Sequence, residues 1–233
     1  GTMRLFTLAL LLVVGISTQA QAQSTAPSVE EIVYSPSNVF LPQGFDDNDN
    51  AQVVIHGYYP NTCYRSGRAR VRVDQANNNV IVEDTALYYP DMMCLQMIVP
   101  YTKTLDVGLL DATNYNVLTA TANEYEVRGA LPVAKSSSKK PDNFVYAPIT
   151  EVAVKYDRKK AKVNVSLKGL FKNTCLKVKD VKIINSKPDV IEVLPILQAD
   201  SGPHCKKTET SFEHTFTLDN RASEKKLLHI RSM

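Results

Sequence analysis

Four cysteines carry the most reactive side chains of this 233-residue sequence, and they form two evenly spaced pairs. Cys94 follows Cys63 at nearly the same distance as Cys205 follows Cys175. Paired cysteines in an exported chain are typical of structural disulfides. Of the three possible pairings, the equal spacing favours Cys63 with Cys94 and Cys175 with Cys205. The alternative, a four-cysteine zinc site, requires short CxxC knuckles that the sequence lacks.

The residues before the first cysteine of each pair show that the chain contains one pattern twice. Residues 57–63 read GYYPNTC and residues 169–175 read GLFKNTC. Apolar residues match at the same offset and, after one deletion, further along: Val53 with Val165, Ile55 with Leu167, Tyr59 with Phe171, Leu105 with Phe216 and Val107 with Leu218. Because the matched positions are apolar, what repeats is a hydrophobic core.

The four histidines offer little support for catalysis. His56, His204, His214 and His229 are scattered, and the sequence has neither a GxSxG motif nor a glycine-rich phosphate loop. Lys168 replaces His56 in the second copy, so we expect His56 on a strand surface. The sequence therefore predicts a protein that is not an enzyme and has no cofactor.

An acidic segment partly matches the opening of a calcium-binding loop. Oxygen ligands at alternate positions are what Ca²⁺ requires, and five consecutive residues could supply them: Asp46, Asp47, Asn48, Asp49 and Asn50. Ala51 stands where such a loop needs glycine, and Gly57 stands where it needs a bidentate glutamate. We interpret the segment as a solvated acidic loop without a metal, with calcium binding as the alternative.

Aromatic and methionine side chains gather around the first cysteine pair, where a disulfide would bring them together. Such residues, with arginine, are enriched at protein interfaces. The predicted binding residues are Tyr58, Tyr59, Tyr64, Arg65, Tyr88, Tyr89, Met92 and Met93. The alternative is core packing, which Phe171 at the position matching Tyr59 favours for that residue at least.

The elements that must position these residues are strands. Residues 69–73 and 162–168 alternate apolar and polar side chains, which is typical of half-buried strands. Residues 77–79 and 157–160 predict hairpin turns, since Asn and Asp favour turns. Asp111 and Tyr115 have the spacing of a tyrosine corner. The sequence predicts an all-β protein of two tandem immunoglobulin-like β-sandwich modules, each with one disulfide inside the module.

The first residues predict export. Gly1 and Thr2 read as a cloning remnant, residues 5–16 are an apolar run, and residues 20–22 form an AxA cleavage site. Residues 1–22 are therefore the remnant plus a secretory signal peptide, and the mature chain has no transmembrane segment. The first module spans residues 24–134, a polar linker spans 135–147, and the second module spans 148–233. We expect a periplasmic, extracellular or cell-surface location.

Charge divides unequally between the two copies. Residues 24–150 hold 14 acidic and 9 basic residues, net −5, whereas residues 151–233 hold 10 acidic and 17 basic residues, net +7. Opposite charges favour docking of the two copies against each other or head-to-tail contact between chains. Export and the lack of aromatic residues among the lysines argue against nucleic acid.

These patterns together predict an exported, non-enzymatic binding or structural subunit of a periplasmic or cell-surface assembly, with a protein partner in the envelope. The size, the two predicted sandwiches and the basic pI resemble those of the pilus-chaperone family. This architectural resemblance implies a periplasmic chaperone as one alternative function, without assigning a role to any residue. A secreted protease inhibitor is a further alternative.

Overall fold

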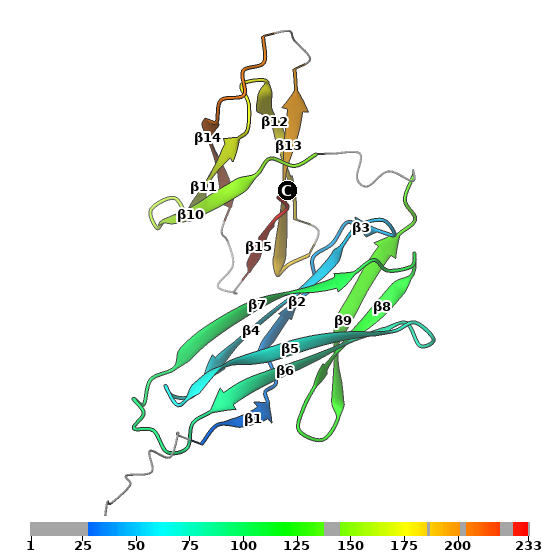
Figure 1. Ribbon diagram of the computed structural model, residues 1–233, viewed down its shortest axis with the longest axis vertical. Helices are drawn as coiled ribbons and strands as arrows, with labels where there is room; N and C mark the ends of the chain where they lie inside the picture. The colour runs from blue at the N-terminus through cyan, green and yellow to red at the C-terminus, as the bar shows by residue number, and fades with distance from the viewer. Residues whose placement is uncertain (1–27, 138–144, 186, 201–203, 220–225, 233) are drawn as a thin grey trace, which may run out of the picture.

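The computed structural model describes residues 28–137, 145–185, 187–200, 204–219 and 226–232. These residues form fifteen strands and no helix, which confirms the all-β prediction (Figure 1). It follows that the described part of the chain has no helix able to cross a bilayer. The predicted signal peptide, residues 1–22, lies outside the described residues.

The N-terminal half forms two facing sheets. The larger sheet has the order β5-β6-β8-β9-β3, and β1 also pairs with β6; the smaller sheet has the order β2-β4-β7. The strands are β1 (Glu30–Val33), β2 (Asn38–Phe40), β3 (Phe45–Asp46), β4 (Ala51–Tyr59), β5 (Tyr64–Asp74), β6 (Asn79–Tyr88), β7 (Val99–Gly108), β8 (Asn114–Ala120) and β9 (Tyr125–Ala134). We call this half the N-terminal sandwich.

Alternate residues of these strands build the N-terminal core. Side chains two apart on a strand share one face, so Val80 and Val82 of β6 pack against Val53 and Ile55 of β4 across the gap between the sheets. Tyr115, predicted for a tyrosine corner, is fully buried in this core.

The C-terminal half forms two sheets of three strands each. One sheet has the order β10-β11-β14 and the other β12-β13-β15. The strands are β10 (Ile149–Asp157), β11 (Lys162–Phe171), β12 (Leu176–Ile184), β13 (Val190–Ala199), β14 (Thr210–Asp219) and β15 (Leu227–Ile230). The sheets share a second core centred on Val165, Leu167, Ile191 and Val193. We call this half the C-terminal sandwich.

The sequence repeat corresponds to repeated strand pairing. Val53 pairs with Leu105 between β4 and β7, and the matched Val165 pairs with Phe216 between β11 and β14. Two parallel pairs also correspond, β6 with β8 and β13 with β15. Immunoglobulin domains consist of antiparallel sheets, so these parallel pairs distinguish both sandwiches from that topology.

Both predicted hairpin turns are present. Between β5 and β6, Asn78 has a φ of 52° and the backbone N–H of Asn77 donates to the Asp74 carboxylate. Between β10 and β11, Asp157 Oδ1 accepts from the backbone N–H of Lys159 at 3.0 Å. Asn and Asp stabilise turns in these two ways, which is why the turns could be recognised from the sequence.

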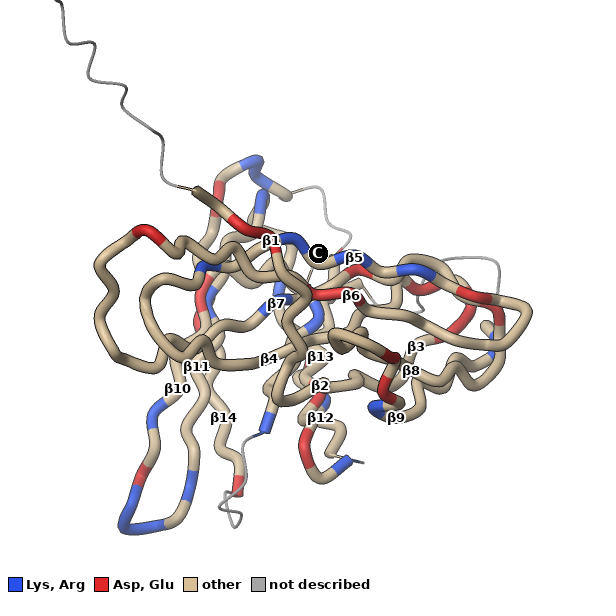
Figure 2. The backbone as a smooth tube through the Cα atoms, turned by 90° about the horizontal axis from the view of Figure 1, so that it is seen from below, with Lys and Arg blue, Asp and Glu red and all other residues tan. Residues whose placement is uncertain are grey.

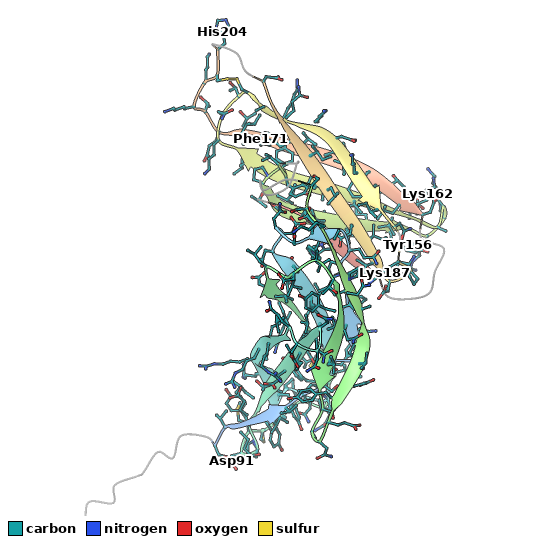
Figure 3. All side chains as sticks on the ribbon, turned by 90° about the vertical axis from the view of Figure 1, so that its right-hand side faces the viewer. Asp91, Tyr156, Lys162, Phe171, Lys187 and His204 are labelled. Atoms are coloured by element: carbon teal, nitrogen blue, oxygen red, sulfur yellow. A yellow bond between two sulfur atoms is a disulfide. The ribbon has the colours of Figure 1, made fainter. Side chains whose placement is uncertain are left out.

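An interface joins the two sandwiches. Phe40 and Val54 of the N-terminal sandwich pack with Val190 and Leu227 of the C-terminal one. Figure 3 places Lys187 at this junction, where its ammonium donates to the Leu41 carbonyl at 3.2 Å and burial lowers its pKa.

Polar contacts extend the same interface. His229 lies between Glu192, at 2.8 Å, and the Gln52 side-chain oxygen, at 3.0 Å. Arg231 donates to the Gly44 carbonyl at 2.8 Å and its guanidinium lies over the Phe45 ring. Residues of both sandwiches thus satisfy one another's polar groups.

The ends of the predicted linker are attached to the two sandwiches. Lys135 forms an ion pair with Asp47, and the Ser136 N–H donates to the same carboxylate at 2.8 Å. At the other end, Ala147 is fully buried and its N–H donates to the Pro195 carbonyl at 2.8 Å. The middle of the predicted linker, residues 138–144, lies outside the described residues.

Candidate binding surface

Both sandwiches contain the disulfide that the spacing predicted. Cys63 joins Cys94 and Cys175 joins Cys205, with a Cα–Cα distance of 5.3 Å in each case. Each bond connects the turn after β4 or β11 to the long loop before β7 or β14. The disulfide therefore fixes a loop at one end of each sandwich.

The repeated NTC sequence has the same hydrogen bonds in both copies. Asn61 Oδ1 accepts from the Cys63 N–H at 2.9 Å, and Asn173 Oδ1 accepts from the Cys175 N–H at 3.0 Å. This is the turn-stabilising use of asparagine. The motif residues beside each cysteine thus shape the turn that presents it.

The threonine of the NTC sequence binds the facing loop. The Thr62 N–H donates to the Leu95 carbonyl at 3.2 Å, and the Leu95 N–H donates to Thr62 Oγ1 at 2.8 Å. Thr174 makes the same reciprocal pair with Lys206, at 3.1 Å in both directions. Each loop is therefore held by two hydrogen bonds beside its disulfide.

The repeated glycine makes room for an aromatic ring on the neighbouring strand. A Cβ atom at Gly57 would lie 2.6 Å from the Tyr101 ring, and one at Gly169 would lie 2.5 Å from the Phe212 ring. Tyr101 stacks on Tyr59 with ring centroids 4.5 Å apart. The GxxxNTC motif is therefore a structural device, with a glycine, an aromatic stack, a turn and a disulfide.

In the N-terminal sandwich the aromatic stack is larger. Tyr34 and Tyr64 both contact Tyr59, and Tyr64 stacks on Tyr88 with centroids 4.8 Å apart. Burial raises the pKa of Tyr34, Tyr59 and Tyr101, and the nearby Asp84 carboxylate raises the pKa of Tyr101 further. These phenols remain protonated at neutral pH, so the stack is a neutral packing unit.

A buried ion pair lies beside this stack. Asp84 of β6 is 1% exposed and bonds to the Lys103 ammonium of β7. Lys103 also donates to the Gly67 carbonyl at 3.1 Å and the Thr85 carbonyl at 3.3 Å. A buried charge requires such partners, and this arrangement connects the two sheets.

The loop of residues 89–98 between β6 and β7, which we call the apolar loop, presents hydrophobic side chains to solvent. Met93 is 100% exposed, and Leu95 and Ile98 are 69% and 67% exposed. The loop lies at the end of the N-terminal sandwich away from the C-terminal one, where Figure 3 labels Asp91. Exposed apolar groups that gather in one loop mark an interaction surface more strongly than scattered ones.

The predicted binding residues divide into three groups in the structure. Tyr59 is 2% exposed and belongs to the core, as the alternative interpretation held. Tyr64 and Tyr88, which adjoin the apolar loop, and Tyr89, its first residue, are half-buried. The exposed members are Tyr58, Arg65, Met92 and Met93.

Several residues of this region did not enter the predicted set. Leu95, Met97 and Ile98 are exposed in the apolar loop, and Tyr34 and Tyr101 complete the stack beneath it. The absence of alternation in residues 89–98 is the signal that could have distinguished an exposed loop from strand residues.

The surroundings of His56 differ from those that the sequence predicted. His56 is 8% exposed rather than on the surface, because its ring packs against Tyr58 and its Nδ1 lies 2.9 Å from Thr102 Oγ1.

In the acidic segment, Asp47 binds Lys135 and Ser136, which lower its pKa, and Asp49 lies 3.6 Å from Arg231. These carboxylates thus have protein partners. No cluster of three or more potential metal ligands occurs within the described ranges.

The matching loop of the C-terminal sandwich is hydrophilic. Its described residues, 204–209, are all exposed and include His204, Lys206, Lys207 and Glu209. Figure 3 places His204 at the far end of the C-terminal sandwich. The same frame therefore presents an apolar surface at one end of the molecule and a polar one at the other.

Comparison with known proteins supports the fold of the N-terminal half. Residues 53–130 match a family described as the ORF11 beta-sandwich domain. The match includes the first disulfide, the apolar loop and every residue of the aromatic stack except Tyr34. No curated protein and no solved structure matched the chain.

Proposed function

We propose that this protein is an exported, non-enzymatic binding or structural subunit of an envelope or cell-surface assembly, built from two related immunoglobulin-like β-sandwich modules. The observation that carries the proposal is the apolar loop. It exposes three methionines, Met92, Met93 and Met97, together with Leu95 and Ile98. Methionine is enriched where proteins bind one another.

The way the loop is held supports a role in binding. The disulfide at Cys94 and the hydrogen bonds between Thr62 and Leu95 restrict the loop before any partner arrives. A restricted loop loses less conformational entropy on binding than a free one. Half-buried Tyr64 and Tyr88 adjoin the loop and stack on each other.

Polar groups at the edge of the loop would provide specificity. Arg65 lies over the Tyr89 ring at 5.6 Å, and Asp91 accepts a hydrogen bond from the Ser28 side chain. An apolar centre with a polar rim is the usual anatomy of a protein interface. The expected partner is therefore another protein.

Support for two related modules comes from their matching strand pairs and disulfides. The immunoglobulin-like description covers the facing sheets and the single disulfide of each module, and the parallel pairs are a departure from it. Support for export comes from the predicted signal peptide and from the disulfides, which persist in oxidising compartments.

The proposal is tested by photo-crosslinking from the apolar loop. A photoreactive residue at Met93 should capture a specific protein in the envelope of the source cell, and Met97→Asp should abolish that product because a charge would be buried at the interface. The matched control is a photoreactive residue at Leu109, which is equally apolar and 69% exposed on the same sandwich.

The same products from Met93 and Leu109, or a Met93 product that survives Met97→Asp, would contradict a specific binding role for the loop. Thermal unfolding of the Met97→Asp variant serves as the folding control, because Met97 is 52% exposed and contributes little to the core.

A further inference from the structure

The N-terminal sandwich is closed by a strand that the C-terminal sandwich does not have among the described residues. β9 pairs with β8, with Leu131 opposite Tyr115, and its Leu131 and Val133 are buried in the core. In the C-terminal sandwich, β15 corresponds to β8. No described strand pairs with β15 on the side away from β13.

The free side of β15 has backbone groups available for pairing. The N–H groups of Leu227 and Arg231 donate to the Asp189 and Val193 carbonyls, on the side of β13. Because successive N–H groups of a strand point to opposite sides, those of Leu228 and Ile230 point away from β13. An unpaired edge of this kind can accept another strand.

Since the described residues include no equivalent of β9, core positions of the C-terminal sandwich are also left uncovered. Leu41 lies beside β9, close to Gly129, and is 5% exposed. The matched residue of the C-terminal sandwich is Val154. Val39 pairs with Ile55, and Val152 pairs with the matching Leu167, so the residues two positions further on, Leu41 and Val154, also match. Val154 is 57% exposed.

A groove runs between β10 and β15 at this place, with a volume of about 270 Å³. Its apolar lining includes Val154, Val163, Leu218 and Leu228, which belong to four different strands and both sheets. Tyr156, on the same face of β10, is also more than half exposed. We call this site the strand groove.

Charge around the strand groove is mainly positive. Lys226 lines it together with Asp219, and Lys162 lies 4.0 Å from Asp219. Figure 3 shows Tyr156 and Lys162 at the same edge of the C-terminal sandwich. Figure 2 shows further basic residues at the adjacent β10–β11 turn, residues 158–160. An acidic segment would complement this rim.

We propose that the strand groove binds an extended, acidic segment of another protein, which adds to the free edge of β15 and inserts apolar side chains at alternate positions between the sheets. Strand addition of this kind takes affinity from main-chain hydrogen bonds and specificity from alternate side chains. In the N-terminal sandwich, β9 has the role that we propose for this occupant: it pairs with β8 and buries Leu131 and Val133 in the core. This site is separate from the apolar loop and does not depend on its function.

The test uses a synthetic peptide with the sequence of β9 carrying Arg128→Glu, which keeps the apolar pattern and adds negative charge. We expect it to bind the full chain, and Val154→Asp to weaken binding about tenfold or more because a charge would enter the apolar groove. The matched control is Leu170→Asp, since Leu170 is exposed on the opposite face of the same sheet. The peptide with Arg128 retained should bind less tightly.

Amide hydrogen exchange gives a second measurement that does not depend on a variant folding. Peptide binding should protect the Leu228 and Ile230 N–H groups. The proposal is overturned if the peptide does not bind, if Val154→Asp leaves binding unchanged, or if protection changes along β8 instead. Self-association of the chain that Val154→Asp abolishes, without peptide binding, would also overturn it and identify a second copy as the occupant.

Discussion

The two sandwiches share a turn, an aromatic pair and a disulfide, which we call the frame, and they differ in the loop that this frame holds. Both have the GxxxNTC turn, a stacked aromatic pair and a disulfide to the facing loop. The loop itself is apolar in the N-terminal sandwich and hydrophilic in the C-terminal one. This difference indicates that the repeated residues build the turn, and that residues that differ between the copies determine the chemistry of the surface.

The sandwiches differ again in their sheets. β9 covers the N-terminal core, whereas the matching region of the C-terminal sandwich is an open groove. The closed copy also contains the Asp84–Lys103 pair, and Pro195 and His214 stand at the corresponding positions of the open copy. The two copies thus use different interactions to join their sheets.

Lys103→Met should have the largest effect among substitutions that test this comparison. It leaves Asp84 buried without its counter-charge, and breaking such a pair costs about 3–5 kcal/mol of unfolding free energy. Urea unfolding measures the loss. The double variant Asp84→Leu with Lys103→Met should recover much of it, because no uncompensated charge remains. A single variant as stable as the parent would show that the pair does not join the sheets.

Removing either disulfide should cost slightly less. The two bonds close loops with sequence separations of 31 and 30, and the chain-entropy account gives about 3–4 kcal/mol for each. We expect Cys63→Ser with Cys94→Ser and Cys175→Ser with Cys205→Ser to lose similar stability in urea. Only the first pair should also reduce crosslinking from Met93. Reduced crosslinking with both pairs would show that the frames are not independent.

Alanine at the repeated glycine should affect the copies unequally. At Gly57 the new methyl would meet the Tyr101 ring, which can move, whereas at Gly169 it would lie 1.9 Å from the backbone oxygen of Pro148. Overpacking costs about 1–3 kcal/mol, and we expect Gly169→Ala to be the worse of the two. Unfolding midpoints in urea give the order, and the reverse order would contradict this account.

Alkaline pH should have the smallest effect and should act on the N-terminal sandwich. The pKa values of Tyr34, Tyr59 and Tyr101 are raised in the folded protein, whereas tyrosines of the unfolded chain have a pKa of about 10. This contribution is complete below pH about 10 and is lost as the pH rises toward the folded pKa values. Unfolding midpoints between pH 8 and pH 11 measure it.

The corresponding pair of the C-terminal sandwich, Phe171 and Phe212, does not titrate and provides the contrast. Tyr101→Phe should therefore reduce the alkaline loss of stability. An unchanged pH dependence in that variant would mean that other groups cause the loss.

Features encoded by short stretches could be predicted from the sequence. The hairpin turns, the strand character and the pairing of the cysteines follow from local residue types and from the repeat. Even the alignment of Val53 and Leu105 with Val165 and Phe216 was visible, since these residues pair directly in the structure.

Features that depend on which strands meet could not be predicted. The sequence of β9 does not reveal that it closes one sandwich, and nothing near β15 reveals that no described strand pairs with its outer edge. Tyr58 and Tyr59 are neighbours of one type, yet one is 40% and the other 2% exposed. Their environments depend on the face of β4 that each occupies, and the match with Phe171 indicated that face for Tyr59 alone.

The interface between the sandwiches determines what the linker contributes to their association. Phe40, Val54, Val190 and His229 already join the two halves without it. A covalent connection between surfaces that recognise each other acts by raising their effective concentration. Cleavage of the chain within residues 138–144 would therefore yield two fragments that remain associated through this interface, in a fraction that falls as the solution is diluted.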